Sequence, residues 1–111
     1  MPLPVSDWRL PDRIKSKMRI DDFIWLPDIV DKIERKHTVL PEEAEEVFFN
    51  EPRFRFVESG HRKGENVYSA SGTTDGGRKL IVFFIFKTPR SALVLSAREM
   101  DGGERRRYER K

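Results

Sequence analysis

The longest apolar run of the chain extends from Leu80 to Phe86 and is rich in Val, Ile and Phe. A short, unbroken run of such residues is typical of a strand that is buried on both faces. Turn-forming residues flank it, Asp75-Gly76-Gly77 before and Thr88-Pro89-Arg90-Ser91 after. A second apolar stretch, Ala92 to Ala97, follows the second turn. We therefore predict a β-hairpin over residues 78–98 at the centre of an antiparallel sheet.

Two segments before residue 50 carry apolar residues at helical spacing. Pro27 stands at a natural first helical position, and the apolar spacing after it predicts a helix from Pro27 to His37. Pro41 opens a second helix with glutamates in its first turn, and Asn50 ends it. The short link between the two predicts a helical hairpin.

Shorter patterns complete the fold. Residues 53–57 read RFRFV, so we expect Phe54 and Phe56 to point inward from a half-buried strand. Asp101 is a suitable N-cap for a final helix. The order β-α-α-β-β-β-β-α predicts an α+β fold, with two N-terminal helices and one C-terminal helix on one side of a small antiparallel sheet. The remaining predicted elements are an edge strand within 19–25, a strand over 65–73 and the final helix over 104–111.

The composition fits one small domain. The chain has 111 residues, and Pro2, Pro4 and Pro11 mark residues 1–17 as an N-terminal extension of a domain over 18–111. Cysteine is absent and there are two histidines, which excludes a disulfide framework and argues against a structural zinc site. The N-terminus lacks the apolar segment of a signal peptide, so we expect a cytoplasmic protein without a membrane partner.

Charges are clustered although the formal net charge is only +3. Residues 9–19 and 105–111 are rich in Lys and Arg, whereas the charged side chains of residues 42–51 are all acidic. Clustered cations indicate a polyanionic partner such as RNA. The alternative is a solvated, charged surface without a ligand.

Arg98 closes the predicted hairpin just before the final helix. This position suits an arginine that holds a phosphate, and the alternative is an ion pair with Glu99 or Glu104. Tyr108 follows Glu104 by four residues, so the two share a helix face. The tyrosine is suited to stacking on a base or donating a proton, with packing of the helix on the sheet as the alternative.

The two histidines are further candidates for proton transfer. His61 lies in a polar loop with Arg62, Lys63 and Glu65, and its titration near neutral pH suits general acid or base catalysis. A loop histidine without a role is the alternative. His37 ends a predicted helix, where its partial charge favours the helix dipole.

Several short segments point to a known family when they are considered together. Each contains charged or aromatic residues near the boundary of a predicted helix or strand. They are Trp25 before a helix that ends in Lys36-His37, PEEAEEVF over 41–48, His61 before Gly64-Glu65, Gly76-Gly77-Arg78 before an apolar strand, Ser96-Ala97-Arg98, and Glu104 to Tyr108. In this order and spacing they resemble the BrnT family, toxins of type II toxin–antitoxin pairs. The resemblance covers about residues 19–110.

The resemblance implies a RelE-like α+β fold and a ribonuclease that stops translation. It also implies a partner, a BrnA-like antitoxin with a ribbon-helix-helix DNA-binding part. In that family toxin and antitoxin form a two-plus-two assembly that represses its own operon, so operator DNA is contacted only through the antitoxin. A homodimer of the toxin is compatible with this assembly.

We expect a metal-independent endoribonuclease that needs no cofactor. The 2′-hydroxyl of the RNA would attack the adjacent phosphate, with a base, a charge stabiliser and an acid supplied by side chains. His61 or Glu65 is the expected base, and Arg98, with Arg78 or Arg62, is the expected charge stabiliser. The expected acid is His61, Tyr108 or His37. The predicted catalytic residues are His61, Glu65, Arg98 and Tyr108. The predicted RNA-binding residues are Lys36, His37, Arg62, Arg78, Arg105 and Arg106.

The alternative function is a non-catalytic module of the same fold that binds RNA or a protein. Members of the family often carry basic residues at positions that here are Gly60, Val67, Gly102 and Gly103. The missing cations belong to the expected RNA face. Their absence makes the non-catalytic alternative stronger for this chain than for a typical member of the family.

Overall fold

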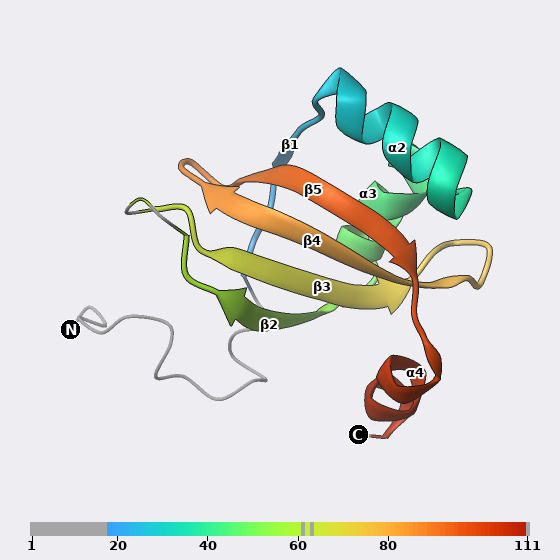
Figure 1. The fold of residues 1–111 in the computed structure, drawn as a ribbon. Coiled ribbons are helices and arrows are strands. Elements are labelled where there is room, and N and C mark those ends of the chain that lie inside the picture. Colours follow the sequence, from blue (N-terminus) through green and yellow to red (C-terminus); the bar gives the residue numbers. More distant parts are fainter. Residues whose placement is uncertain (1–17, 61, 63, 111) are drawn as a thin grey trace.

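The computed structural model describes residues 18–60, 62 and 64–110 (Figure 1). Its helices and strands follow the predicted order, so the α+β class with three helices is confirmed. The predicted extension over residues 1–17 lies outside the described residues. The elements are β1 (Asp22–Ile24), α2 (Pro27–His37), α3 (Pro41–Phe49), β2 (Arg53–Glu58), β3 (Val67–Thr73), β4 (Lys79–Lys87), β5 (Ser91–Glu99) and α4 (Gly102–Glu109).

The helices begin where the sequence predicts. Pro27 and Pro41 both lie in the first turn of their helices, where the missing N–H of proline costs no hydrogen bond. α2 ends at Thr38, whose φ of 56° turns the chain toward α3. Asp101 caps α4 by accepting a hydrogen bond from the Glu104 N–H at 2.7 Å. Within the described ranges, none of these helices has the length and apolar content that crossing a membrane requires.

The sheet has the strand order β1-β5-β4-β3-β2, so β4 is its central strand, as predicted. The pairs β2–β3, β3–β4 and β4–β5 are antiparallel. β1 instead pairs with β5 in parallel, with Asp22 opposite Ser91 and Ile24 opposite Leu93. The prediction of a purely antiparallel sheet is therefore wrong for β1. A strand of three residues carries too little pattern to reveal its direction.

The core lies between the sheet and the layer formed by α2 and α3 (Figure 1). Leu80, Val82 and Phe84 alternate along β4 and are fully buried. They form one cluster with Ile33 of α2 and Val47 of α3. Burial of each such side chain contributes about 1.5–3 kcal/mol. We call this side of the sheet the helix face.

α4 contacts the opposite side, which we call the open face because α2 and α3 leave it uncovered. The Tyr108 hydroxyl of α4 lies 3.1 Å from the Thr73 hydroxyl of β3, and Lys79 Nζ lies 3.9 Å from the Glu109 carboxylate. The prediction that all helices share one side is therefore wrong for α4. The charged sequence of this helix has no apolar stripe from which its side could be derived.

β5 contains a bulge at Leu95. Val94 and Ser96 lie opposite consecutive residues of β4, so Leu95 has no partner there. The Leu95 carbonyl accepts a hydrogen bond from Lys32 Nζ of α2 at 3.0 Å. β1 pairs only with residues 91–93 of β5. Beyond them, the Lys32 side chain supplies the hydrogen bond that the Leu95 carbonyl oxygen would otherwise lack.

Of the two phenylalanines expected to point inward from β2, only Phe54 is buried. Phe56 is 51% exposed, so its predicted burial is wrong. The Phe48 ring of α3 lies 6.0 Å from Phe54, whereas Phe56 contacts the Tyr68 ring of the neighbouring strand at 5.9 Å. The helix layer therefore covers the start of this edge strand but not its middle.

Amides of β4 should exchange with solvent more slowly than those of the edge strands. β4 is hydrogen-bonded to a strand on each side, whereas β1 and β2 are edges. In hydrogen exchange followed by NMR, Val82 and Phe84 should be protected far more than Phe23 and Phe56. Similar exchange rates for the two pairs would contradict the central position of β4.

Candidate functional site

A row of side chains on the open face carries an arginine at each end. The pairing register aligns Arg53 of β2, Ser71 of β3, Ile81 of β4 and Arg98 of β5. Neighbouring strands lie about 4.8 Å apart, so three steps separate the backbones of the two arginines by about 14 Å. We call these four residues the arginine row. Because both arginines stand on strands, the distance between their backbones is fixed.

The adjoining row adds a third cation and an aromatic ring. It aligns Arg55, Ser69, Phe83 and Ser96. The guanidinium carbon of Arg98 lies 5.6 Å from the centroid of the Phe83 ring, within the range of a cation–π contact. The open face thus combines cations and an aromatic ring with small hydroxyl side chains, of which Ser69 is buried.

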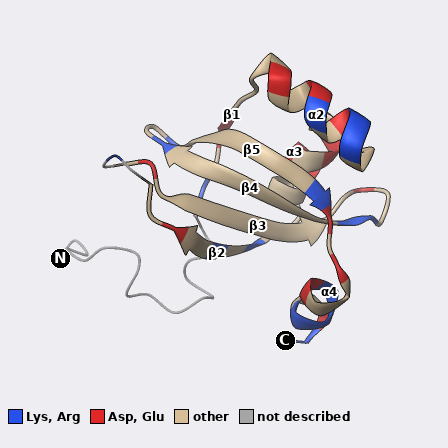
Figure 2. Ribbon diagram, viewed as in Figure 1, with Lys and Arg blue, Asp and Glu red and all other residues tan. Residues whose placement is uncertain are grey.

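α4 lies beside the end of the sheet at which the arginine row is found (Figure 1). The guanidinium carbon of Arg53 lies 5.3 Å from the centroid of the Tyr108 ring. Figure 2 shows Lys and Arg positions along α4, and the side chains of Arg105 and Arg106 are exposed. The predicted residues Arg98, Tyr108, Arg105 and Arg106 therefore belong to one region.

Arg98 forms a bidentate ion pair with Glu104. From the sequence, such an ion pair was the alternative to phosphate binding by this arginine. Its Nη1 and Nη2 each lie 2.8 Å from a different oxygen of the Glu104 carboxylate, a strong arrangement for an arginine and a carboxylate. Hydrogen bonding to Glu104 raises the pKa of Arg98, although partial burial opposes this. Hydrogen bonding to Arg98 in turn lowers the pKa of Glu104.

Glu104 also fixes the start of α4. Its Oε1 accepts a hydrogen bond from the Asp101 N–H at 2.9 Å, while the Asp101 carboxylate caps the helix in return. One carboxylate therefore holds the helix N-terminus and orients the Arg98 guanidinium. A phosphate at the terminal nitrogens of Arg98 must share them with Glu104 or displace it.

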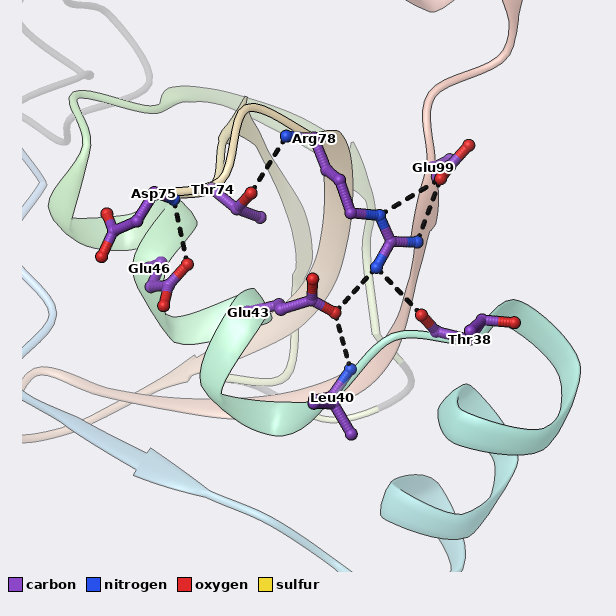
Figure 3. A network of polar contacts seen from close by, with 8 residues as sticks. All are labelled: Thr38, Leu40, Glu43, Glu46, Thr74, Asp75, Arg78 and Glu99. Atoms are coloured by element: carbon purple, nitrogen blue, oxygen red, sulfur yellow. Dashed lines mark hydrogen bonds and ion pairs between the residues drawn. The ribbon is translucent and has the colours of Figure 1, made fainter.

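Arg78 lies before β4 on the helix face and joins three parts of the chain (Figure 3). Its Nη1 donates to Glu43 of α3 at 2.7 Å and to the Thr38 carbonyl at 2.9 Å. Its Nε and Nη2 donate to Glu99 of β5 at 3.2 and 3.0 Å. These contacts give Arg78 a structural role, and its role in RNA binding stays a prediction.

Glu65 is separated from the arginine row. It lies before β3, and its carboxylate is 3.6 Å from Lys87 Nζ at the far end of β4. The seven residues of β3 span about 20 Å, so Glu65 and α4 lie at opposite ends of the sheet (Figure 1). Arg62 is exposed in the same β2–β3 connection as Glu65. His61 lies outside the described residues.

Lys36 and His37 form the last turn of α2. Lys36 is exposed and His37 is half-buried. They precede Thr38, whose carbonyl binds Arg78, and they lie with α2 on the helix face. The predicted site residues therefore occupy separate places: the α4 end of the open face, the β2–β3 connection and the end of α2.

The sequence analysis missed Arg53 and Arg55. The alternation in RFRFV directs attention to the phenylalanines on one face of β2, but it also places both arginines together on the other face. Two cations at this spacing on an edge strand were the available signal. Among the residues that the structure describes, the ion pairs include neither of these arginines.

No protein-family model and no curated protein matches the chain. In the described part of the chain, no three His, Cys, Asp or Glu side chains are grouped as metal ligands would be. The geometry of the open face is therefore the main basis for assigning a function, together with the sequence resemblance.

Replacing Arg78 by alanine should destabilise the fold on the order of 2–3 kcal/mol. The substitution leaves the partly buried Glu43 without its cation and removes hydrogen bonds from three segments. Urea unfolding followed by circular dichroism measures this loss. Arg90→Ala is the matched control, because it breaks only an exposed pair with Asp21 and should have little effect. Equal losses would contradict the proposed structural role.

Glu104→Gln should destabilise the chain by about 1–2 kcal/mol at pH 7. The pKa of Glu104 is lowered in the folded chain, so its ionised form stabilises the fold above the ordinary pKa of 4.5. This contribution is lost as the pH falls through the lower, folded-state pKa. Unfolding free energies of the variant and the parent should therefore converge in acid.

Glu109→Gln is the control for this pH dependence, because Glu109 is 53% exposed and 3.9 Å from its cation. Its unfolding free energy should follow that of the parent at every pH. A constant difference between Glu104→Gln and the parent from neutral to acid pH would contradict the role of the ion pair.

Proposed function

We propose that the open face binds single-stranded RNA and that the chain is the toxin of a type II toxin–antitoxin pair. The observation that carries the proposal is the arginine row with the adjoining Arg55 and Phe83. The sequence resemblance to BrnT toxins supports the same function. We propose further that the α+β fold is RelE-like.

The open face offers partners for both parts of an RNA strand. The guanidinium groups of Arg53, Arg55 and Arg98 suit phosphate oxygens. Phe83 and Tyr108 have ring faces on which unpaired bases can stack. The strands fix the backbones of the three arginines and Phe83, and α4 fixes that of Tyr108, before a ligand arrives. Less conformational freedom is therefore lost on binding.

The proposed reaction is cleavage by the RNA's own 2′-hydroxyl. The 2′-oxygen loses its proton to a base and bonds to the adjacent phosphorus, the bond to the 5′-oxygen breaks, and that oxygen takes a proton from an acid. Arg98 would stabilise the phosphorane charge, and Tyr108 would supply the proton. His61 or Glu65 is the proposed base. In this proposal a BrnA-like antitoxin neutralises the toxin in the cytoplasm.

A non-catalytic RNA-binding module is the second candidate, and two observations favour it. Both terminal nitrogens of Arg98 are already paired with Glu104. Glu65 stands at the other end of the sheet, paired with Lys87. Glu65 in this position is too far from Arg98 for both to act on one phosphate. They could do so only if the β2–β3 connection approached α4.

Arg55→Ala should weaken binding to a labelled single-stranded RNA and lower its salt dependence by about one phosphate contact. Fluorescence anisotropy titrations at several salt concentrations measure both effects. Arg35→Ala is the matched control, since it removes an exposed arginine of α2 that pairs with Asp31 and lies off the open face. Equal weakening by both substitutions would contradict binding at the open face.

Growth arrest and cleavage of a model RNA distinguish the two candidate functions. For a ribonuclease, Arg98→Ala should lower cleavage about 100–1,000-fold and His61→Ala by about a hundredfold or more. Arg106→Ala should have only a small effect, because Arg106 is exposed on α4. RNA binding without cleavage by the parent protein favours the second candidate, and absence of RNA binding contradicts both.

A further inference from the structure

Aromatic rings form a continuous chain of contacts on the helix face. Neighbouring ring centroids lie 5.0–6.0 Å apart. The middle of this series is buried, whereas its two ends, Phe49 and Phe56, are 65% and 51% exposed. We call the series the aromatic chain; its members in order are Phe56, Tyr68, Phe84, Phe48, Phe23 and Phe49.

The exposed ends are extensions of the core and not isolated surface residues. Phe49 ends α3 and is the most exposed large apolar side chain in the part of the chain that the structure describes. Phe56 stands on the edge strand β2 beside Val57, which is 42% exposed. Exposed aromatic surface that continues a core is typical of a surface to which another segment binds.

The N-terminal segment of the same chain reaches the domain at this place. Ile20 belongs to the same core cluster as Phe48 and Phe84 of the aromatic chain, and Met18 packs against that cluster. The described part of the chain therefore begins at the core cluster that contains the middle of the aromatic chain. Residues 1–17 lie outside the described residues. Within them, the stretch 8–17 contains the large apolar residues Trp8, Leu10 and Ile14.

Length and charge both suit this segment to the exposed rings. Ile14 is four residues from Met18 and can extend at most about 14 Å from it, and Trp8 at most about 35 Å. Exposed acids follow the two rings closely in sequence, Glu51 after Phe49 and Glu58 after Phe56. Residues 9–17 carry four cations and a single acid, Asp12, so the charges are complementary.

We propose that residues 8–17 of this chain bind across the exposed ends of the aromatic chain and complete its burial. A tethered segment acts at an effective concentration in the millimolar range, so even weak contacts hold it. The binding surface lies on the helix face, so it leaves the open face accessible. The inference therefore does not depend on the proposed RNA binding.

Paramagnetic relaxation in the full chain tests this placement. The chain has no cysteine, so Ser6→Cys takes a single nitroxide label without altering the aromatic surface. The amide signals of Phe49 and Phe56 should lose most of their intensity, while those of Lys36 and Arg106 should be retained. Equal broadening of all four signals would overturn the proposal. If the signals broaden only through the nitroxide of another molecule, in a mixture of labelled and unlabelled chains, the surface binds a second copy. That result would also overturn the proposal.

A double-mutant comparison gives an independent readout. Replacing Trp8, Leu10 and Ile14 together by serine should lower the urea midpoint, and adding Phe49→Ser should lower it by less than the sum of the separate shifts. Leu40→Ser is the matched control, because Leu40 is 45% exposed at the N-cap of α3, and its shift should add. Additive shifts for Phe49→Ser as well would overturn the proposal.

Discussion

The burial of Phe84 at the centre of the sheet is the constraint on which the rest of the fold depends. Its ring is fully buried and contacts Phe48 of α3, Phe54 of β2 and Tyr68 of β3. One side chain thus holds the helix layer against three strands. Loss of a buried ring of this size typically costs about 3–5 kcal/mol, a large part of the stability of a small domain. The apolar side chains of β4 that face the helices leave its other side available for charged neighbours.

Local chemistry predicts most of this fold because the element boundaries carry their own signals. Pro27, Pro41 and Asp101 each start a helix through a property of that residue alone. The direction of β1 and the side taken by α4 depend on contacts between distant residues, such as Tyr108 with Thr73. Phe56 shows the same limit, since alternation gives the face to which it points and not whether a helix covers that face.

The site was predictable to a similar degree. The position of Arg98 at the end of a strand follows from the hairpin, but the choice between phosphate and Glu104 depends on the geometry of the α4 cap. Placing Glu65 far from Arg98 requires the strand order, which a single sequence does not contain. The backbones of Arg53 and Arg98 stand about 14 Å apart, and Glu104 pairs with the charge of Arg98, so the open face can hold both cations without a large cost in stability.

The bulge at Leu95 has a consequence for how such proteins change over time. Val94 points to the helix face, and strict alternation from it would send Arg98 toward the core. One additional residue reverses the alternation, so that Ala97 is buried and Arg98 reaches the open face. Loss of the bulge at constant strand length would therefore turn Arg98 toward the core, whereas deletion of Leu95 would remove the bulge and leave Arg98 on the open face. In comparisons between related sequences, the face on which this arginine lies therefore follows from strand length and bulge together, and not from strand length alone.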